Sequence, residues 1–226
     1  MNIFKKIYLR LLNRNFYNFI IRQDGKVFEI LFNIFSLLQN SKNRIYYKNK
    51  FFYNSEMNWR FFHKKQGLMV YGFGFKKRKD VLLKDYLIKN IEFKDDDVVI
   101  DIGANNGDFY LCFDKKIKYY AYEPSPIVFS NLEHNIKNQN LYNLGVSNSE
   151  DSEIDFYLSD EHGDSSILPI NNYIKKISIE TTTLDKEIDK IQQRIKLIKL
   201  EAEGFEPEIL QGLKKNLNSV EYITID

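Results

Sequence analysis

Hydrophobic and polar positions change their spacing along the chain and divide it into three blocks. Residues 1 to about 44 carry apolar residues at helical spacing with a break near residues 23–25, which predicts two helices. Residues 45–79 are aromatic and basic and predict short extended segments and loops. From Asp80 short apolar runs alternate with amphipathic stretches. We therefore expect a regular domain over 80–226 behind an N-terminal helical and aromatic extension over 1–79.

The pattern beyond Asp80 predicts an α/β fold. Apolar, often β-branched runs predict strands at 98–103, 118–124, 141–147, 195–204 and 221–226, and helical spacing predicts helices at 80–90, 125–138, 184–191 and 206–217. The segments 153–159 and 176–183 alternate apolar and polar residues, as half-buried antiparallel strands do. Alternating strands and helices predict a doubly wound parallel sheet, for which we expect the strand order 3-2-1-4-5.

Composition excludes several classes of protein. The formal net charge is +2, which argues against a dedicated nucleic-acid binder. One cysteine and three scattered histidines leave no internal disulfide and no metal-ligand spacing, so we expect no metal. The richness in Asn, Lys, Ile, Phe and Tyr is typical of an AT-rich, bacterial-type genome and is not a functional signal.

The N-terminal residues show no targeting or membrane-spanning segment. Arg10 and Arg14 interrupt the first apolar stretch, and the apolar run at 27–38 is too short to span a bilayer, so we expect a cytoplasmic protein without stable membrane insertion. Residues 3–12 have the pattern of an amphipathic helix with a basic face. Such a helix either packs on its own domain or on a second subunit, or it makes peripheral membrane contact through residues 1–22.

A glycine-containing segment, DIGANNGDF at 101–109, directly follows the first predicted strand. Gly103 permits a sharp turn, and Gly107 would let backbone approach a ligand without an intervening Cβ. The spacing G-x-x-x-G differs from the dinucleotide pattern G-x-G-x-x-G, which argues against an NAD-dependent oxidoreductase. Glu123 ends the second strand and is placed to accept hydrogen bonds from both ribose hydroxyls of a nucleoside. The alternative is a tight β–α turn beside a solvated Glu123.

Carboxylates gather where the fourth parallel strand is predicted to end. Glu201 and Glu203 alternate by two and are expected to share one face of an extended segment, as a general base or as ligands of a divalent cation. Alternatively, Glu203 fixes a turn. Lys199 is expected to point away from them as a sheet-face residue with an exposed amine. Asp164, in the polar loop 163–166, is a further candidate for the catalytic site.

Several segments occur together in the order and spacing of a known family. They are VVIDIGANNGDF (98–109), YAYEPSP (120–126), the pair Asn131 and Asn135, GDSS (163–166), TTTLD (181–185) and IKLEAEGFEPEILQG (198–212). Over about residues 70–226 the chain resembles the FkbM-type S-adenosylmethionine-dependent methyltransferases. The resemblance implies a Rossmann-like methyltransferase sheet and S-adenosylmethionine as cofactor. It implies cofactor-binding positions at Asp101, Gly103, Ala104, Asn105, Gly107, Glu123, Pro124, Val146 and Ser147.

The resemblance also implies O-methylation of a hydroxyl on a saccharide or a secondary metabolite, so we expect a glycan or small-molecule acceptor. Two departures from the family's pattern bear on this expectation. Glu201 stands where the family often has Asp, and two strands that normally follow the fifth are apparently missing after Asp226. We therefore expect an acceptor site that is incomplete or is completed in a homo-oligomer. The competing interpretation is a truncated, non-catalytic cofactor-binding or structural module.

Overall fold

The computed structural model describes residues 16–38, 43–64, 67–71, 74–149, 153–159, 165–171 and 173–226. The chain divides into two compact units, Met1–Gly74 and Phe75–Asp226. The amphipathic pattern at 3–12 lies outside the described residues. Among the described helices none is long and apolar enough to cross a membrane.

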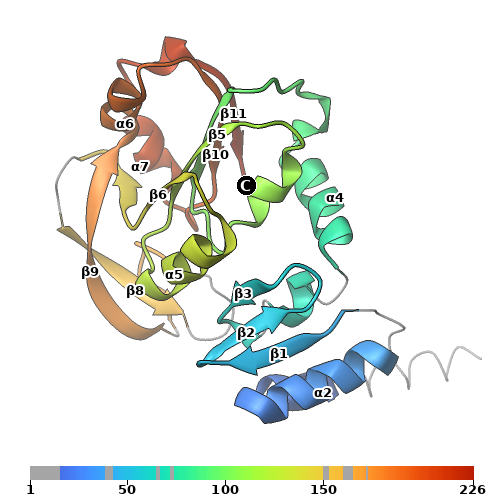
Figure 1. Ribbon diagram of the computed structural model, residues 1–226. Coiled ribbons are helices and arrows are strands. Elements are labelled where there is room, and N and C mark those ends of the chain that lie inside the picture. Colours follow the sequence, from blue (N-terminus) through green and yellow to red (C-terminus); the bar gives the residue numbers. More distant parts are fainter. Residues whose placement is uncertain are drawn as a thin grey trace, which may run out of the picture. The chain divides into compact units, whose positions relative to one another are not determined.

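The N-terminal unit combines one long helix with a small antiparallel sheet (Figure 1). Helix α2 (Gly25–Leu38) is followed by the meander β1 (Ile45–Lys48), β2 (Phe51–Asn54) and β3 (Trp59–Phe61), and then by the π-helix η1 (Gly67–Tyr71). Its core is aromatic, and the ring of Phe52 lies 4.7 Å from that of Phe28 and 5.6 Å from that of Phe61. The aromatic residues of this segment therefore serve packing.

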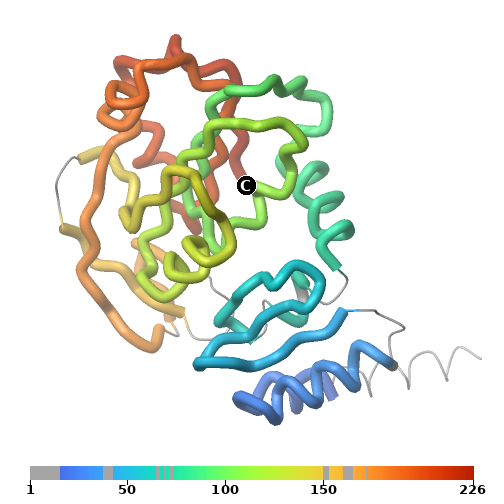
Figure 2. Tube along the Cα trace, viewed as in Figure 1, coloured from blue at the N-terminus to red at the C-terminus, as the bar shows by residue number. Residues whose placement is uncertain are grey.

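The C-terminal unit contains a five-stranded parallel sheet. Its order is β11 (Val220–Ile225), β10 (Ile195–Leu200), β4 (Val98–Ile102), β5 (Lys118–Tyr122) and β6 (Asn140–Tyr142). If these five strands are numbered 1 to 5 as they occur in the sequence, their order across the sheet, starting from β6, is 3-2-1-4-5. All four pairings are parallel. Figure 2 shows the path of the chain through them, from the green of β4 to the red of β11. The carboxyl ends of the five strands therefore share one edge, which we call the carboxyl edge.

Side chains on the two faces of this sheet meet different elements. One face packs on helices α6 (Leu184–Ile191) and α7 (Glu206–Gln211), through residues such as Ile100 and Ile198. On the other face Tyr119 meets the 3₁₀ helix η3 (Asp108–Cys112), which packs on α4 (Phe75–Asp85). Helix α5 (Pro126–Asn135) and the short 3₁₀ helices η2 (Ile88–Asn90) and η4 (Leu217–Ser219) complete the connections. Helices on both faces make the sheet doubly wound.

The segment 141–147 is not the single strand that its apolar pattern predicts. It forms β6 and, separately, β7 (Gly145–Ser147), which joins β9 (Tyr173–Thr183) and β8 (Glu153–Ser159) in a second sheet. Asn143 lies at the break, where its Nδ2 donates to the carbonyl oxygens of Glu123 at 2.8 Å and Pro124 at 3.0 Å. These two bonds fix the kink that redirects the chain. The pairing of β8 with β9 is antiparallel, as predicted.

Three other predicted elements also have wrong boundaries. Helix α4 begins at Phe75 and ends at Asp85, and helix α7 ends at Gln211 and not near Leu217. Strand β10 ends at Leu200 and does not continue to Gly204, because Glu203 and Gly204 both have positive φ. A left-handed backbone conformation cannot continue a strand.

Candidate functional site

Gly103 makes the turn between β4 and the rest of the glycine loop (residues 103–107). Its φ is +70°, and a Cβ built on it would lie 1.8 Å from the carbonyl oxygen of Glu201. Its amide donates to the carbonyl oxygen of Tyr122 at 3.0 Å, so the turn rests against the ends of both β5 and β10. Only glycine fits a position with this φ and this close approach of backbone.

Gly107 is required by its backbone conformation and by its neighbours. Its φ is +93°, and an added Cβ would meet Ile136 Cδ1 at 2.6 Å and Leu132 Cδ1 at 2.9 Å. A side chain here would therefore clash with the apolar residues at the end of α5. The expectation that Gly107 also lets backbone approach a ligand stays a prediction.

Glu123 lies at the end of β5 and joins the two loops that follow β4 and β5. Its Oε2 accepts from the amide of Asn105 at 3.0 Å, and its Oε1 accepts from the amide of Ser125 at 2.8 Å. Asn105 has a φ of +50°, a conformation that Asn tolerates better than most residues. Glu123 is buried, and this burial raises its pKa to about 7 although both amide bonds oppose the shift.

Two asparagines on α5 hold the glycine loop from its other side. Asn131 Nδ2 donates to Asn106 Oδ1 at 3.0 Å, and Asn135 Nδ2 donates to the Asn106 carbonyl oxygen at 2.9 Å. Sequence reasoning noted the pair but gave it no role. The i, i+4 spacing was the available signal, since it places both amides on one helix face.

Three charged residues meet beneath the glycine loop, and we call Asp101, Lys199 and Glu201 the edge triad. Lys199 Nζ lies 3.0 Å from Asp101 Oδ1 and 2.9 Å from Glu201 Oε2. It also donates to the carbonyl oxygen of Gly103 at 2.9 Å. The prediction that Lys199 points away from the carboxylates with an exposed amine is wrong. Alternate residues of a strand share a face, so 199 and 201 lie together at the end of β10.

The edge triad is enclosed by aromatic side chains. Lys199 Nζ lies 5.6 Å from the centre of the Tyr86 ring and 6.0 Å from that of Phe109. The Tyr86 hydroxyl lies near Glu201 and favours its charged form, and the Tyr119 hydroxyl donates to Asp101 Oδ2. Asp101 and Lys199 are buried, whereas the Glu201 side chain remains 38% exposed.

The environment of the edge triad separates the pKa values of its members. Burial alone would raise the pKa of Glu201, but Lys199 and the Tyr86 hydroxyl outweigh burial and lower it. Burial disfavours the charged form of Lys199, yet the attraction of Asp101 and Glu201 raises its pKa above the ordinary value. Burial raises the pKa of Asp101 against the opposing effects of Lys199 and Tyr119. A carboxylate with a lowered pKa is a weaker proton acceptor than an ordinary one, and the role of Glu201 as a general base stays a prediction.

Glu203 does not share a face with Glu201. The strand has ended, and Glu203 is exposed in a turn with φ +53°. Its carbonyl oxygen accepts from Ser166 Oγ at 3.3 Å, which brings the end of the 163–166 loop to the carboxyl edge. Asp164, in the same loop, lies outside the described residues.

The remaining predicted cofactor positions differ in their surroundings. Ala104 is buried, and its amide donates to Tyr122 O at 3.1 Å. The Pro124 carbonyl is bound by Asn143, as described above. Val146 and Ser147 are buried in β7, where Val146 belongs to the core under α6 and α7. They lie in the second sheet and not at a strand end of the parallel sheet, since the chain breaks at Asn143.

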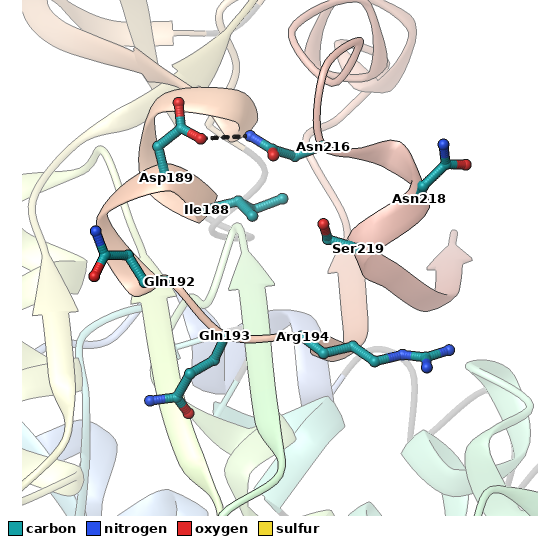
Figure 3. Close-up of a pocket in the computed structure, with 8 residues that line it drawn as sticks. All are labelled: Ile188, Asp189, Gln192, Gln193, Arg194, Asn216, Asn218 and Ser219. Carbon is teal, nitrogen blue, oxygen red and sulfur yellow. Dashed lines mark hydrogen bonds between the residues drawn. The ribbon is translucent and has the colours of Figure 1, made fainter.

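A separate pocket lies at the opposite, amino edge of the sheet (Figure 3). Its volume is about 590 Å³, and it is lined by residues that precede β10 and β11, among them Gln193, Arg194, Asn216 and Ser219. Figure 3 shows Asp189 bonded to the side chain of Asn216 at its rim. Among the residues that the structure describes, no group of three or more His, Cys, Asp and Glu side chains is arranged to hold a metal ion.

The parallel sheet is doubly wound, a glycine turn follows its first strand, and an acidic residue follows its second. These features define a nucleotide-binding class of α/β protein. The model of the methyltransferase FkbM domain matches residues 101–226, which include the glycine loop, Glu123 and the edge triad. The chain belongs to the FkbM methyltransferase family.

The chain is similar in sequence to three proteins that are named as methyltransferases. The chain is 27% identical over 145 residues to the hexuronic acid methyltransferase AglP of Haloferax volcanii, covering 60% of this chain and 57% of that protein. It is 26% identical over 149 residues to methyltransferase 1 of Beauveria bassiana, covering 54% of this chain and 60% of that protein. It is 25% identical over 181 residues to the 2-O-methyltransferase NoeI of Sinorhizobium fredii, covering 70% of this chain and 74% of that protein.

A solved structure of methyltransferase FkbM from Methylobacillus flagellatus is 19% identical, with a TM-score of 0.37, and covers 55% of this chain and 30% of that one. The matches to AglP and to methyltransferase 1 cover about three fifths of the length of each of these relatives.

Proposed function

We propose that this chain is an S-adenosylmethionine-dependent O-methyltransferase whose acceptor is a hydroxyl group of a saccharide. One observation carries the proposal: the family match spans both the glycine loop and the end of β10, and Lys199 joins these two segments at one edge of the sheet. The names of two relatives, a hexuronic acid methyltransferase and a 2-O-methyltransferase, support a sugar hydroxyl as acceptor.

The residues at the carboxyl edge fit a nucleoside that carries an amino acid. Glu123 is a buried carboxylate at the end of β5, and each of its oxygens has a second lone pair beyond the amide bond it accepts. It would hold the ribose diol, while the backbone from Gly103 to Asn105 would line the methionine end. Gly107 and Val146 would support this site from behind, since both pack on protein.

The cofactor supplies an activated methyl group on a sulfonium. In the transfer the bond from carbon to sulfur breaks as the bond from carbon to the acceptor oxygen forms, and the hydroxyl proton passes to a base or to water. Among the candidates Glu203 suits the role of base better than Glu201, because Glu201 is bound to Lys199 and Tyr86. Asp164 remains a second candidate for this proton.

Titration and mass spectrometry test the proposal in sequence. Calorimetric titration of the full chain with S-adenosylmethionine and S-adenosylhomocysteine should show binding of both. Incubation with S-adenosylmethionine and a panel of uronic acids and neutral sugars should then add one methyl group to a sugar. Glu203→Gln should lower kcat and leave the affinity for S-adenosylhomocysteine unchanged. If neither nucleoside binds, the proposal is refuted. If they bind but no methyl group is transferred to any acceptor, a non-catalytic module is favoured.

A further inference from the structure

The edge triad places two carboxyl groups around a single ammonium. Lys199 supplies one ammonium to two carboxylates, at 3.0 Å from Asp101 and 2.9 Å from Glu201. Both oxygens of Asp101 face donors, Lys199 Nζ on one side and the Tyr119 hydroxyl on the other. Glu201 pairs with Lys199 at 2.9 Å, and the nearby Tyr86 hydroxyl favours its charged form. When both carboxyl groups are ionised, the three side chains together carry a charge of −1, although burial works against the ionisation of Asp101.

Charges around the triad do not cancel this excess. Arg78 also acts on Glu201, but its guanidinium is held by Asp108, with Nε 2.8 Å from Oδ2. Glu123 adds another carboxyl group beside the glycine loop, with a pKa that burial raises to about 7. The whole chain has a formal charge of +2, so the negative excess is a local property of this edge.

Burial makes the excess charge effective. Asp101 is 0% and Lys199 2% exposed, and the rings of Tyr86 and Phe109 lie beside the ammonium. An uncompensated charge in such surroundings acts more strongly than one in water. Glu201, with a 38% exposed side chain, is the member through which this charge reaches the solvent-facing side of the edge. Lys199 also fixes the geometry, because it binds the Gly103 carbonyl oxygen and Glu201 at the same time.

We propose that the edge triad lets this chain discriminate between a positively charged sulfonium donor and its neutral thioether product, with Glu201 as the residue that determines the preference. The proposal rests on the proposed function, since it concerns the same cofactor. Methyl transfer removes the positive charge from sulfur, so the attraction exists before the transfer and is lost after it. Glu201 therefore favours donor binding and product release, and no proton transfer is required of it.

Three variants separate this role from a structural one. Glu201→Gln keeps the shape and hydrogen-bonding capacity of the side chain but removes its charge, and Glu201→Asp keeps the charge. Glu221→Gln is the matched control, because Glu221 of β11 is paired with Lys196 of β10 at 2.6 Å, at the amino ends of these two strands. Each variant is titrated calorimetrically with S-adenosylmethionine, S-adenosylhomocysteine and an analogue that carries a protonated amine in place of the sulfonium.

We expect Glu201→Gln to weaken binding of both cationic nucleosides about tenfold and to change binding of the neutral one by less than about threefold. Glu201→Asp and Glu221→Gln should retain the wild-type ratio of the affinities. An unchanged ratio in Glu201→Gln, or equal weakening of all three nucleosides, would overturn the proposal while leaving the proposed function intact. Absence of nucleoside binding by the wild-type chain would instead remove the proposed function.

The wild-type chain provides a second test that does not depend on the folding of a variant. It should bind the protonated-amine analogue more tightly than S-adenosylhomocysteine, because the two differ in charge at the position of the sulfur. Tighter binding of the neutral nucleoside would overturn the proposal.

Discussion

Removing the ammonium of Lys199 should destabilise the sheet unit strongly and in a pH-dependent way. Lys199→Met keeps an unbranched apolar stem but leaves Asp101, which is 0% exposed, and Glu201 without their shared cation. Breaking a buried ion pair by removing one partner costs about 3–5 kcal/mol, because an uncompensated charge remains in the interior. We expect a loss of this size in the free energy of unfolding at pH 8.

The sign of the pH dependence follows from the buried carboxyl group. Burial already raises the pKa of Asp101, and loss of the ammonium raises it further. A carboxyl group whose pKa is higher in the folded than in the unfolded chain destabilises the fold when it is ionised. The destabilisation is therefore largest above the folded pKa and shrinks as the pH falls toward the unfolded value near about 4. The loss in Lys199→Met should accordingly be smaller at pH 5 than at pH 8.

Urea unfolding followed by circular dichroism at both pH values measures this difference. Lys196→Met is the matched control, because Lys196 lies on the same strand and pairs with the surface residue Glu221. We expect no measurable shift in its unfolding midpoint, since exposed ion pairs contribute little. A loss below about 1 kcal/mol in Lys199→Met, or an equal loss at the two pH values, would refute the reasoning about the edge triad.

Four further predictions concern Glu123, two glycines and Asn131. Burial raises the pKa of Glu123 to about 7, so its ionisation destabilises the fold as the pH rises from about 5 to 8. The thermal midpoint should therefore fall over this range, and it should fall less in Glu123→Gln. Glu123→Ala should also weaken S-adenosylhomocysteine binding by about 1–3 kcal/mol in calorimetry, and unchanged affinity in a folded variant would remove Glu123 from the site. Gly204→Ala should lower the free energy of unfolding by about 1–2 kcal/mol, because its φ is positive. Gly103→Ala should lower it by more, because the new Cβ would also lie 1.8 Å from a backbone carbonyl oxygen. Equal losses for the two variants in urea unfolding would contradict the clash. Asn131→Ala should lose about 1–3 kcal/mol by leaving the buried Asn106 side chain without this donor, and an unchanged unfolding midpoint would show that the bond does not hold the loop.

The parallel sheet was largely predictable because its strands are short, apolar and separated by amphipathic helices. The strands at 98–103, 118–124 and 221–226 were predicted within two residues of their observed ends. Burial on both faces demands continuous apolar runs in such strands, and this requirement is visible in the sequence itself. The resemblance to the family, carried by the segments 98–109 and 198–212, is matched by the family model at 101–226.

The sequence alone failed where a distant hydrogen bond decides the local conformation. Nothing in the apolar run at 141–147 marks the break at Asn143, which exists because the side chain of Asn143 binds the carbonyl oxygens after β5. The end of β10 at Leu200 was equally hidden, since Glu203 adopts a positive φ in a segment whose pattern reads as extended. Local propensity yields to such tertiary contacts.

The sequence by itself determined the class of fold, the glycine turn at Gly103 and the position of Glu123 at a strand end, because each depends on a few adjacent residues. Only the tertiary structure decided what the charged residues do. Lys199 is separated from Asp101 by most of the sheet domain in sequence, yet the two strands are neighbours and their side chains meet at 3.0 Å. The same packing places Gly107 against the apolar side chains at the end of α5 and pairs Glu201 with Lys199. Burial and pairing set the pKa of a side chain, and both arise only when strands distant in sequence come together.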